Sequence, residues 1–515
     1  MVVVSADEMR ALDQWTIAHG TPGNVLMERA GRGALAVLRP LLRGRRGPVL
    51  VVCGRGNNGG DGFVMARLLR RAGRRAEVWL TARPERLDGD AARMLRAWRQ
   101  GGGPLHPLLD ADDVRAFTTR LEKAAAVVDA IFGTGLHSVV REPAAGAIAA
   151  INAADVPVLA VDVASGLSSD TGQALGAAVR ASATATFGQR KIGQCLYPGL
   201  LYGGAVTVVD IGIPDAALAA VAPRGTLLEA GAVARWLRVR PRDSHKGTFG
   251  HVVVLAGSRG KLGAALLAAE GVARAGAGLT TLVVPETLQP LAEGRVPEVM
   301  TRGLPDVEGA FAAAACAHVE AAVEGRAAVV CGPGLGLGDG ARALVRRVLE
   351  STTAPVVLDA DGLNAVAGSQ VLHRRQAPTV ATPHPGEMSR LAGIDTAAVQ
   401  ADRPGTARRF ASETGVICIL KGARTIVADP DGRLAICPTG NPGLASGGSG
   451  DVLAGVVGGL LAQGVPAFEA AALGAYVHGA AADAVAARQG EVGLLARDLL
   501  SEIPGAFAAL GRAAP

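Results

Sequence analysis

A glycine-rich segment near residue 60 has the residue types of a phosphate-binding turn. Gly54, Gly56 and Gly59 satisfy the pattern G-x-G-x-x-G directly after the apolar run Val49–Cys53. Such glycines allow a tight turn and let backbone N–H groups approach phosphate at the start of a helix. An ordinary Rossmann dehydrogenase also carries an acidic residue about 20 positions later, at the end of the next strand. Here Glu77 opens that strand instead, which disfavours a dehydrogenase.

Two further polar loops follow predicted strands in the same half of the chain. One contains Asp129, and the other contains Asp162 and Ser165. Because loops at the carboxyl ends of parallel strands converge on one crevice, these side chains and Asn58 could meet there. Oxygen-rich groups with single carboxylates suit a hard cation better than zinc. Each aspartate taken singly could be a helix cap or turn residue, but three strand ends together favour a site.

In the second half, a run of glycines and serines at Asn441–Asp451 leads into a helical pattern. Free N–H groups at that helix start would hold phosphate or a developing negative charge. Asp451 would then be a base for a hydroxyl group that attacks a phosphoryl group. The alternative is an N-cap aspartate, although a simple cap does not need the glycine run. No G-x-x-x-x-G-K-[ST] motif is present, which argues against a Walker-type NTPase.

His384 stands between two prolines, so its side chain is rigidly presented. A buried structural histidine is the alternative interpretation. Further runs rich in glycine and polar residues surround it in the sequence, and each follows or precedes a predicted strand: Ser244–Gly250, Gly332–Gly336, Thr382–Glu387 and Lys421–Thr425.

Short apolar runs rich in Val and Ile alternate with Ala, Leu and Arg at helical spacing, which predicts repeated β-α units and parallel sheets. A break near 218–226, with Pro223, Arg224 and Gly225, separates two halves without a detectable repeat. We therefore expect two different folds. The predicted strands are Val49–Cys53, Glu77–Thr81, Ala126–Ile131, Val156–Val161, Ala205–Ile211, His251–Ala256, Leu279–Val284, Ala327–Cys331, Pro355–Asp359, Thr379–Thr382 and Val416–Leu420.

The composition is that of a globular chain long enough for two or three domains: 515 residues, 49% hydrophobic and 19% charged. The net charge of +6 comes from scattered arginines, which favours a solvated surface over a nucleic-acid site. Six isolated cysteines without C-x-x-C indicate neither a zinc site nor a disulfide framework. No signal peptide is recognised, and the apolar stretch Val452–Phe468 is too short to span a bilayer. We expect a cytoplasmic homo-oligomer without membrane or nucleic-acid partners.

The first half resembles NAD(P)H-hydrate epimerases over nearly all of residues 1–215, and the motifs that carry the resemblance occur in order: Glu8–Asp13, Gly23–Glu28, Gly56–Gly62, Asp129–Gly135 and Asp162–Gly166. The resemblance implies a Rossmann-like three-layer sandwich at 1–218. One departure is Ala164, where the family commonly has proline.

The same resemblance implies roles for individual residues. It places a potassium ion on Asn58, Asp129 and Ser165 and makes Asp162 the acid/base candidate. Lys191 is its weaker partner, with a surface charge as the alternative. The hydrated cofactor (NADHX or NADPHX) would contact Asn57, Asn58, Gly59, Gly60, Asp61, Gly133, Thr134, Gly135, Leu136, His137, Ser138, Val139 and Asp162.

The second half resembles ADP-dependent NAD(P)H-hydrate dehydratases, which implies a ribokinase-like three-layer sandwich at 226–512. By this resemblance, the hydrate contacts Ala265, Gly334, His384 and Asp451, and Mg²⁺ assists at the phosphoryl group. ADP would contact Lys421, Gly422, Ala423, Arg424, Thr425, Asn441, Pro442, Gly443, Leu444, Ala445, Ser446, Gly447, Gly448, Ser449 and Gly450.

Together these features predict a bifunctional α/β enzyme that repairs hydrated nicotinamide cofactors. The first half would interconvert the R and S epimers at C6, and the second would dehydrate the S epimer with ADP. Two alternatives remain. A ribokinase-like small-molecule kinase fused to a nucleotide-binding domain would release a stable phosphorylated product, and a non-catalytic nucleotide sensor would need neither Asp162 nor Asp451.

Overall fold

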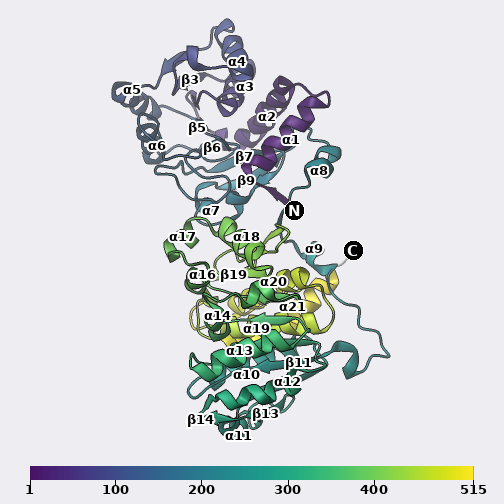
Figure 1. The fold of residues 1–515 in the computed structure, drawn as a ribbon. Coiled ribbons are helices and arrows are strands. Elements are labelled where there is room, and N and C mark those ends of the chain that lie inside the picture. Colours follow the sequence, from purple (N-terminus) through teal and green to yellow (C-terminus); the bar gives the residue numbers. More distant parts are fainter. Residues whose placement is uncertain (514–515) are drawn as a thin grey trace. The chain divides into compact units, whose positions relative to one another are not determined.

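The computed structural model describes residues 1–513 and divides into two compact α/β units. One unit is Val2–Gly225, and the other begins at Thr226 and includes Met1. Figure 1 shows the elements of each unit along the chain.

The N-terminal unit contains a seven-stranded sheet in the order β4-β3-β2-β5-β6-β7-β9, with parallel pairing throughout. The order reverses between β2 and β5, and ligands of open α/β sheets bind at such a switch point. A short strand β1 pairs in parallel with β8. The strands are β1 Val2–Val4, β2 Val49–Cys53, β3 Ala76–Leu80, β4 Leu105–Pro107, β5 Ala126–Ala130, β6 Val158–Val161, β7 Ala183–Phe187, β8 Arg190–Lys191 and β9 Ala205–Val209.

Helices cover both faces of this sheet. Successive side chains of β2 point to opposite faces of the sheet and are apolar on both. Val51 packs with α2, α3 and α4 on one face, while Val52 packs with α5 and α6 on the other. The helices are α1 Ala6–Ala18, α2 Gly23–Leu38, η1 Arg39–Leu42, α3 Asn57–Arg71, η2 Pro84–Arg86, α4 Gly89–Gln100, α5 Ala111–Leu121, α6 Ala144–Ala153, η3 Ile192–Cys195, α7 Gly199–Tyr202 and α8 Asp215–Val221.

The C-terminal unit contains the run β13-β12-β11-β16-β17-β18-β19-β20-β21. Its pairs are parallel as far as β19, and β20 and β21 continue the sheet antiparallel. The strands from here on are β10 Gly225–Leu227, β11 His251–Leu255, β12 Leu279–Pro285, β13 Met300–Leu304, β14 Asp306–Val307, β15 Ala310–Phe311, β16 Ala328–Cys331, β17 Val356–Leu358, β18 Thr379–Ala381, β19 Ile417–Leu420, β20 Ile426–Ala428 and β21 Leu434–Ile436.

One face of this sheet packs against α10, α19, α20 and α21 through small and branched apolar side chains. Along β11, Val252 and Val254 join that core, while Val253 and Leu255 are buried on the opposite face. The helices are α9 Ala230–Ala234, η4 Lys246–Phe249, α10 Leu262–Arg274, η5 Glu286–Leu288, α11 Gln289–Glu293, η6 Ala313–Ala315, α12 Cys316–Val323, α13 Asp339–Ser351, α14 Asp361–Val366, α15 Val371–Arg374, α16 Pro385–Ala392, α17 Thr396–Ala401, α18 Arg403–Thr414, η7 Pro442–Leu444, α19 Ser449–Ala462, α20 Ala467–Gln489 and α21 Ala496–Ala513.

Every strand predicted from an apolar run is present, with ends shifted by two residues or fewer. The α/β class is confirmed. The glycine segment differs from its expected form, because α3 already begins at Asn57 and takes in the second half of the motif. Cys53, Cys331 and Cys418 are buried free thiols within strands. Among residues 1–513, no helix combines the length and apolar character of a membrane span.

Candidate active sites

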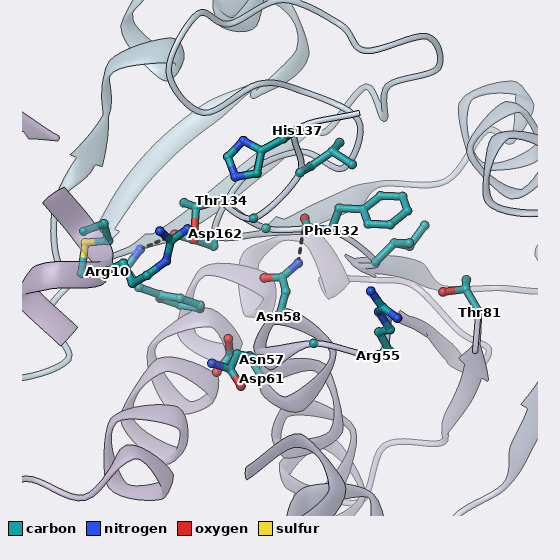
Figure 2. A pocket seen from close by; sticks show the side chains of 18 of the residues that line it. Arg10, Arg55, Asn57, Asn58, Asp61, Thr81, Phe132, Thr134, His137 and Asp162 are labelled. Atoms are coloured by element: carbon teal, nitrogen blue, oxygen red, sulfur yellow. Dashed lines mark hydrogen bonds between the residues drawn. The ribbon is translucent and has the colours of Figure 1, made fainter. Parts of the chain in front are cut away.

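The N-terminal unit has a cavity of about 990 Å³ at the carboxyl ends of its central strands. Its lining comes from the segments that follow β2, β5 and β6, together with α1 and α2. Figure 2 shows Asp162 and Asn58 among the side chains of this cavity. Loops from three strand ends therefore converge, as the sequence predicted.

Asp162 follows β6 in a left-handed backbone conformation, with φ 64°. Its Oδ1 accepts hydrogen bonds from the backbone N–H of Phe187 at 3.1 Å and from Thr186 Oγ1 at 3.2 Å. The same oxygen forms a close ion pair with Lys191 Nζ. Lys191 is fully buried, so the alternative of a surface charge is wrong. The strained backbone and the ion pair hold one carboxylate at a fixed place in the cavity.

Two more carboxyl groups line the cavity around this ion pair, Asp13 from α1 and Asp61 from α3. Burial raises the pKa of Asp13 to about 6, while the charge of Lys191 opposes the shift. Burial also raises the pKa of Asp61 well above its usual range, and the charge of Asp162 adds to this. Oδ1 of Asp13 is buried without a hydrogen-bond partner. The cavity therefore holds two carboxyl groups with raised pKa values beside the ion pair of Asp162 and Lys191.

Asn58, Asp129 and Ser165 gather around the backbone of Phe132, next to the cavity. Asn58 Nδ2 donates to the Phe132 carbonyl at 2.9 Å (Figure 2), and Ser165 Oγ accepts from the Phe132 N–H at 2.8 Å. Ser165 donates to both oxygens of Asp129, with Oγ at 2.5 Å and the backbone N–H at 2.8 Å. The structure thus brings together the three residues expected to hold a cation.

The chemistry of these three residues fits a monovalent cation. Oδ1 of Asn58 is buried and has no hydrogen-bond partner. Burial raises the pKa of Asp129 to about 6 although Ser165 donates to it. A cation would supply the missing partner for Asn58 and the missing counter-charge for Asp129. No group of three or more acidic, histidine or cysteine ligands occurs in the described chain.

Most of the expected substrate contacts line the cavity: Asn57, Asn58, Asp61, Gly133, Thr134, Gly135, Leu136, His137, Ser138, Val139 and Asp162. Gly59 and Gly60 do not. They lie in α3 with their α-carbons against other residues, and a Cβ on Gly59 would collide with the Gly54 carbonyl. Close packing of the helix on the preceding strand explains the glycine there.

In the C-terminal unit, Asp451 is the third residue of α19. Gly448 is the N-cap, with φ 92°, a conformation that favours glycine. Asp451 is therefore not the cap, and the simple N-cap interpretation is wrong. Burial raises the pKa of Asp451 to about 7, and the negative charge of Asp359 contributes while Lys421 opposes it. A carboxyl group with that pKa can accept a proton near neutral pH.

Lys421 is the positive centre of the same site. Its Nζ donates to Asp359 Oδ1 at 2.7 Å and lies 3.8 Å from Glu387 Oε2. Burial lowers the pKa of Lys421, but Asp359 and Glu387 raise it further, so the net shift is upward. A Cβ on Gly450 would lie 3.1 Å from Lys421 Nζ. The start of α19 therefore approaches this ammonium closely, and no side chain intervenes.

The two predicted nucleotide segments are held by residues that sequence reasoning missed. Arg403 donates to the carbonyl of Ala423 at 2.6 Å and shapes the segment Lys421–Thr425. Asp483 accepts from the Gly440 N–H and from Asn441 Nδ2, each at 2.9 Å. Ser446 Oγ is buried without a hydrogen-bond partner. Only long-range contacts reveal Arg403 and Asp483, because neither lies in a recognisable motif.

The remaining predicted contacts have different environments. His384 is half exposed and caps α16, where Nδ1 accepts from the Gly386 N–H at 3.0 Å. It is therefore not a buried structural histidine. Gly334 lies beside Lys261, whose Nζ donates to Asp361 at 3.0 Å. Ala265 is fully buried behind Gly257, so its side chain forms the wall of the glycine loop.

Comparisons with known proteins agree with this division. The family model described as YjeF-related protein N-terminus matches residues 23–193, and the model described as NAD(P)H-hydrate dehydratase matches residues 252–505. The bifunctional NAD(P)H-hydrate repair enzyme of Moorella thermoacetica is 41% identical over 512 residues, which cover 98% of this chain and 96% of the relative.

Two solved structures correspond to the C-terminal unit. A ribokinase-like superfamily protein from Enterococcus faecalis is 27% identical, with a TM-score of 0.50, and covers 56% of this chain and 97% of its own. An ADP/ATP-dependent NAD(P)H-hydrate dehydratase from Bacillus subtilis, co-crystallised with ATP and Mg²⁺, is 32% identical, with a TM-score of 0.48. The match covers 55% of this chain and 98% of the Bacillus subtilis chain. From the full-length match and the two family models, the chain belongs to the bifunctional NAD(P)H-hydrate repair enzymes.

Proposed function

We propose that the N-terminal unit interconverts the R and S epimers of hydrated NADH and NADPH at C6, and that the C-terminal unit dehydrates the S epimer with ADP. The single observation that carries the proposal is the pair of proton-accepting carboxylates. Asp162 is held by Lys191 in a cavity of the first unit, and Asp451 lies at the start of α19 in the second.

C6 of the hydrate bears both a hydroxyl group and the ring nitrogen N1. Asp162 takes the hydroxyl proton, the electrons of the C6–N1 bond move to N1, and the proton passes to that nitrogen from a neighbouring carboxyl group. The aldehyde so formed rotates and closes again from its other face, which inverts C6 without net loss of atoms. Protonated Asp13 or Asp61 is a suitable acid because both carboxyl groups line the same cavity.

A bound potassium ion would be held by Asn58, Asp129 and Ser165, and it would supply a fixed positive charge beside the loop at Phe132. These residues then keep the loop between β5 and α6 in the shape that lines the cavity.

In the second unit, Asp451 takes the proton of the C6 hydroxyl group. The hydroxyl oxygen attacks the β-phosphorus of ADP, and AMP leaves. Phosphate is a far better leaving group than hydroxide. The C6–O bond then breaks, a proton leaves C5, and the double bond of NADH or NADPH returns with inorganic phosphate. Backbone N–H groups at Ser449–Asp451 and the ammonium of Lys421 would stabilise the phosphoryl oxygens, and the close approach of Gly450 to Lys421 supports this role.

Magnesium fits this site as a partner of the phosphates. Mg²⁺ usually binds through one or two carboxylates together with substrate phosphates. The negative charges of Asp359, Asp361 and Glu387 all raise the pKa of Asp451, so three more carboxylates lie near this base. When bound, the metal would neutralise charge on the phosphoryl group.

Hydrated NADH tests the proposal. Pure S epimer with ADP and Mg²⁺ is expected to regain the absorbance of the reduced nicotinamide ring and release AMP and phosphate in equal amounts. Pure R epimer is expected to do so only while Asp162 is intact. A stable phosphorylated hydrate as the final product would instead support a kinase.

A further inference from the structure

The N-terminal cavity extends beyond the segments already assigned to the substrate, towards the end of β3. Arg55, between β2 and α3, and Thr81, directly after β3, both line it. Figure 2 shows these two side chains together, on the opposite side of Asn58 from Asp162. The cavity therefore has a reacting end at Asp162 and a distant end at Arg55.

The pairing of the strands explains why Arg55 and Thr81 are neighbours. β2 and β3 are adjacent parallel strands in which Cys53 is paired with Leu80. The Thr81 N–H donates to the Cys53 carbonyl at 2.9 Å, so Thr81 lies level with the start of the glycine turn. Arg55 follows Cys53 by two residues. Both side chains thus lie at the carboxyl ends of the neighbouring strands β2 and β3.

In Rossmann-type sheets, this place receives the ribose of the adenosine. An acidic residue there binds the 2′-hydroxyl of NAD, whereas a nearby arginine accommodates the 2′-phosphate of NADP. This chain has Thr81 where the acid would stand and Arg55 beside it. A dinucleotide with its nicotinamide at Asp162 and its pyrophosphate at the start of α3 would reach this end with its adenosine.

We propose that Arg55 and Thr81 form a subsite for the 2′-phosphate of hydrated NADPH, an inference that rests on the proposed epimerase function. Arg55 is exposed and forms no ion pair or hydrogen bond among residues 1–513, so its guanidinium is free to bind phosphate. Thr81 adds no negative charge at this place, and its hydroxyl donates to the Cys53 carbonyl at 3.3 Å.

The other cations of the lining are placed or engaged differently. Arg10 forms an ion pair with Asp7 at 2.7 Å, and Figure 2 shows it on the Asp162 side of Asn58. Arg141 belongs to the segment after β5, which is separated from β3 by β2. Asp90 also lines this part of the cavity, and Arg93 lies 3.8 Å from its carboxylate. Arg55 is therefore the cation closest to the expected ribose position.

The test compares R55Q with wild type on the R epimers of hydrated NADPH and hydrated NADH, in the full chain with ADP present. A lost charge-assisted contact predicts a fall in kcat/KM of about tenfold or more for the phosphorylated substrate. For hydrated NADH we expect a fall of less than about threefold. Dehydration of each S epimer by the same preparation normalises both rates. R83Q is the matched control, because Arg83 is exposed near the same strand end but does not line the cavity.

T81D provides a second, independent arm. A carboxylate at this position should repel a 2′-phosphate and accept a hydrogen bond from a 2′-hydroxyl, so the preference should shift towards hydrated NADH. Equal losses on both substrates in R55Q would place Arg55 on the pyrophosphate and overturn the proposal, and so would an unchanged preference. If wild type consumes neither R epimer, the epimerase function itself is wrong, which is a separate result.

Discussion

The fully buried Lys191 forms an ion pair with the partly exposed Asp162 in the N-terminal cavity. Besides Asp162, the Lys191 ammonium donates to the Phe187 carbonyl at 2.9 Å and to Thr186 Oγ1 at 3.0 Å, so all three of its protons have acceptors. These contacts fix the position of the Asp162 carboxylate against the ammonium. A short turn from β7 to β8 brings the two residues together, although 28 residues separate them in the sequence.

We expect D162A to abolish use of the R epimer while S-epimer dehydration continues. Loss of a general base typically costs about 10²–10⁴ in rate. The measurement is the rate of NADH recovery from each pure epimer. T186A tests positioning: it removes one neighbour of the carboxylate and should leave part of the epimerase activity. Retention of full R-epimer turnover in D162A would contradict the assignment.

K191M should destabilise the N-terminal unit, because it leaves the partly buried Asp162 carboxylate without its counter-ion. Breaking a fully buried pair costs roughly 3–5 kcal/mol, and the partial exposure of Asp162 makes this an upper bound. The double variant D162A/K191M removes both charges, and we expect it to recover much of that loss. Chemical unfolding of the three variants measures the free energies. If the loss of unfolding free energy in the double variant equals the sum of the two single losses, the two side chains do not interact.

The pKa of Asp451 gives a pH dependence for the dehydratase. Burial raises this pKa to about 7, and the base is active only when ionised. The value of kcat/KM for the S epimer should therefore fall as the pH drops below about 7 and level off above it. D451N should lose repair of both epimers. D339N alters an exposed acid in the first turn of α13 and serves as control. A flat profile between pH 6 and 8 would argue against Asp451 as the base.

Lys421 should tune that pH profile. Its positive charge lowers the pKa of Asp451, so K421M is expected to move the acid limb of the profile to higher pH as well as weaken ADP binding. K123M changes an exposed lysine of the other unit and should leave the profile in place. A lower activity at every pH without displacement of the limb would mean that Lys421 does not act on Asp451.

Potassium should stabilise the protein in a way that depends on Asp129. Burial raises the pKa of this group to about 6. Because this pKa is raised from 3.8, stability is lost as the pH rises from about 4 to about 6 and stays lower above that range, since burial disfavours the charged form. A cation would offset this loss, so the increase in Tm with KCl over tetramethylammonium chloride should be larger at pH 8 than at pH 5. D129N should remove the difference, and D155N, at an exposed position before β6, should keep it.

Each apolar run taken as a strand is a strand in the structure, because a parallel strand buried on both faces is apolar along its whole length. Several other strands were not predicted. Among them is β7, where Thr184 and Thr186 interrupt the apolar character. The motif residues Asn58, Asp129, Ser165 and Asp451 could be named because each stands at the end of a strand or the start of a helix.

Tertiary packing decided the rest. Nothing in the segment around Lys191 distinguishes a buried ammonium from a surface charge. Only the approach of β8 to the end of β6 makes that difference. Asp13 likewise lies on an ordinary amphipathic helix, and its raised pKa arises from burial in the cavity. The contacts of Arg403 and Asp483 with nucleotide segments also cross long stretches of sequence.

The central claim is that one chain performs both steps of repair. An equal mixture of R- and S-hydrated NADH, with ADP, Mg²⁺ and potassium, tests it directly through the absorbance of the reduced nicotinamide ring. We expect complete recovery with wild type, recovery of the S half alone at the enzymatic rate with D162A, and no recovery with D451N. Recovery of only the S half by wild type, or complete recovery at the wild-type rate by D162A, would contradict it.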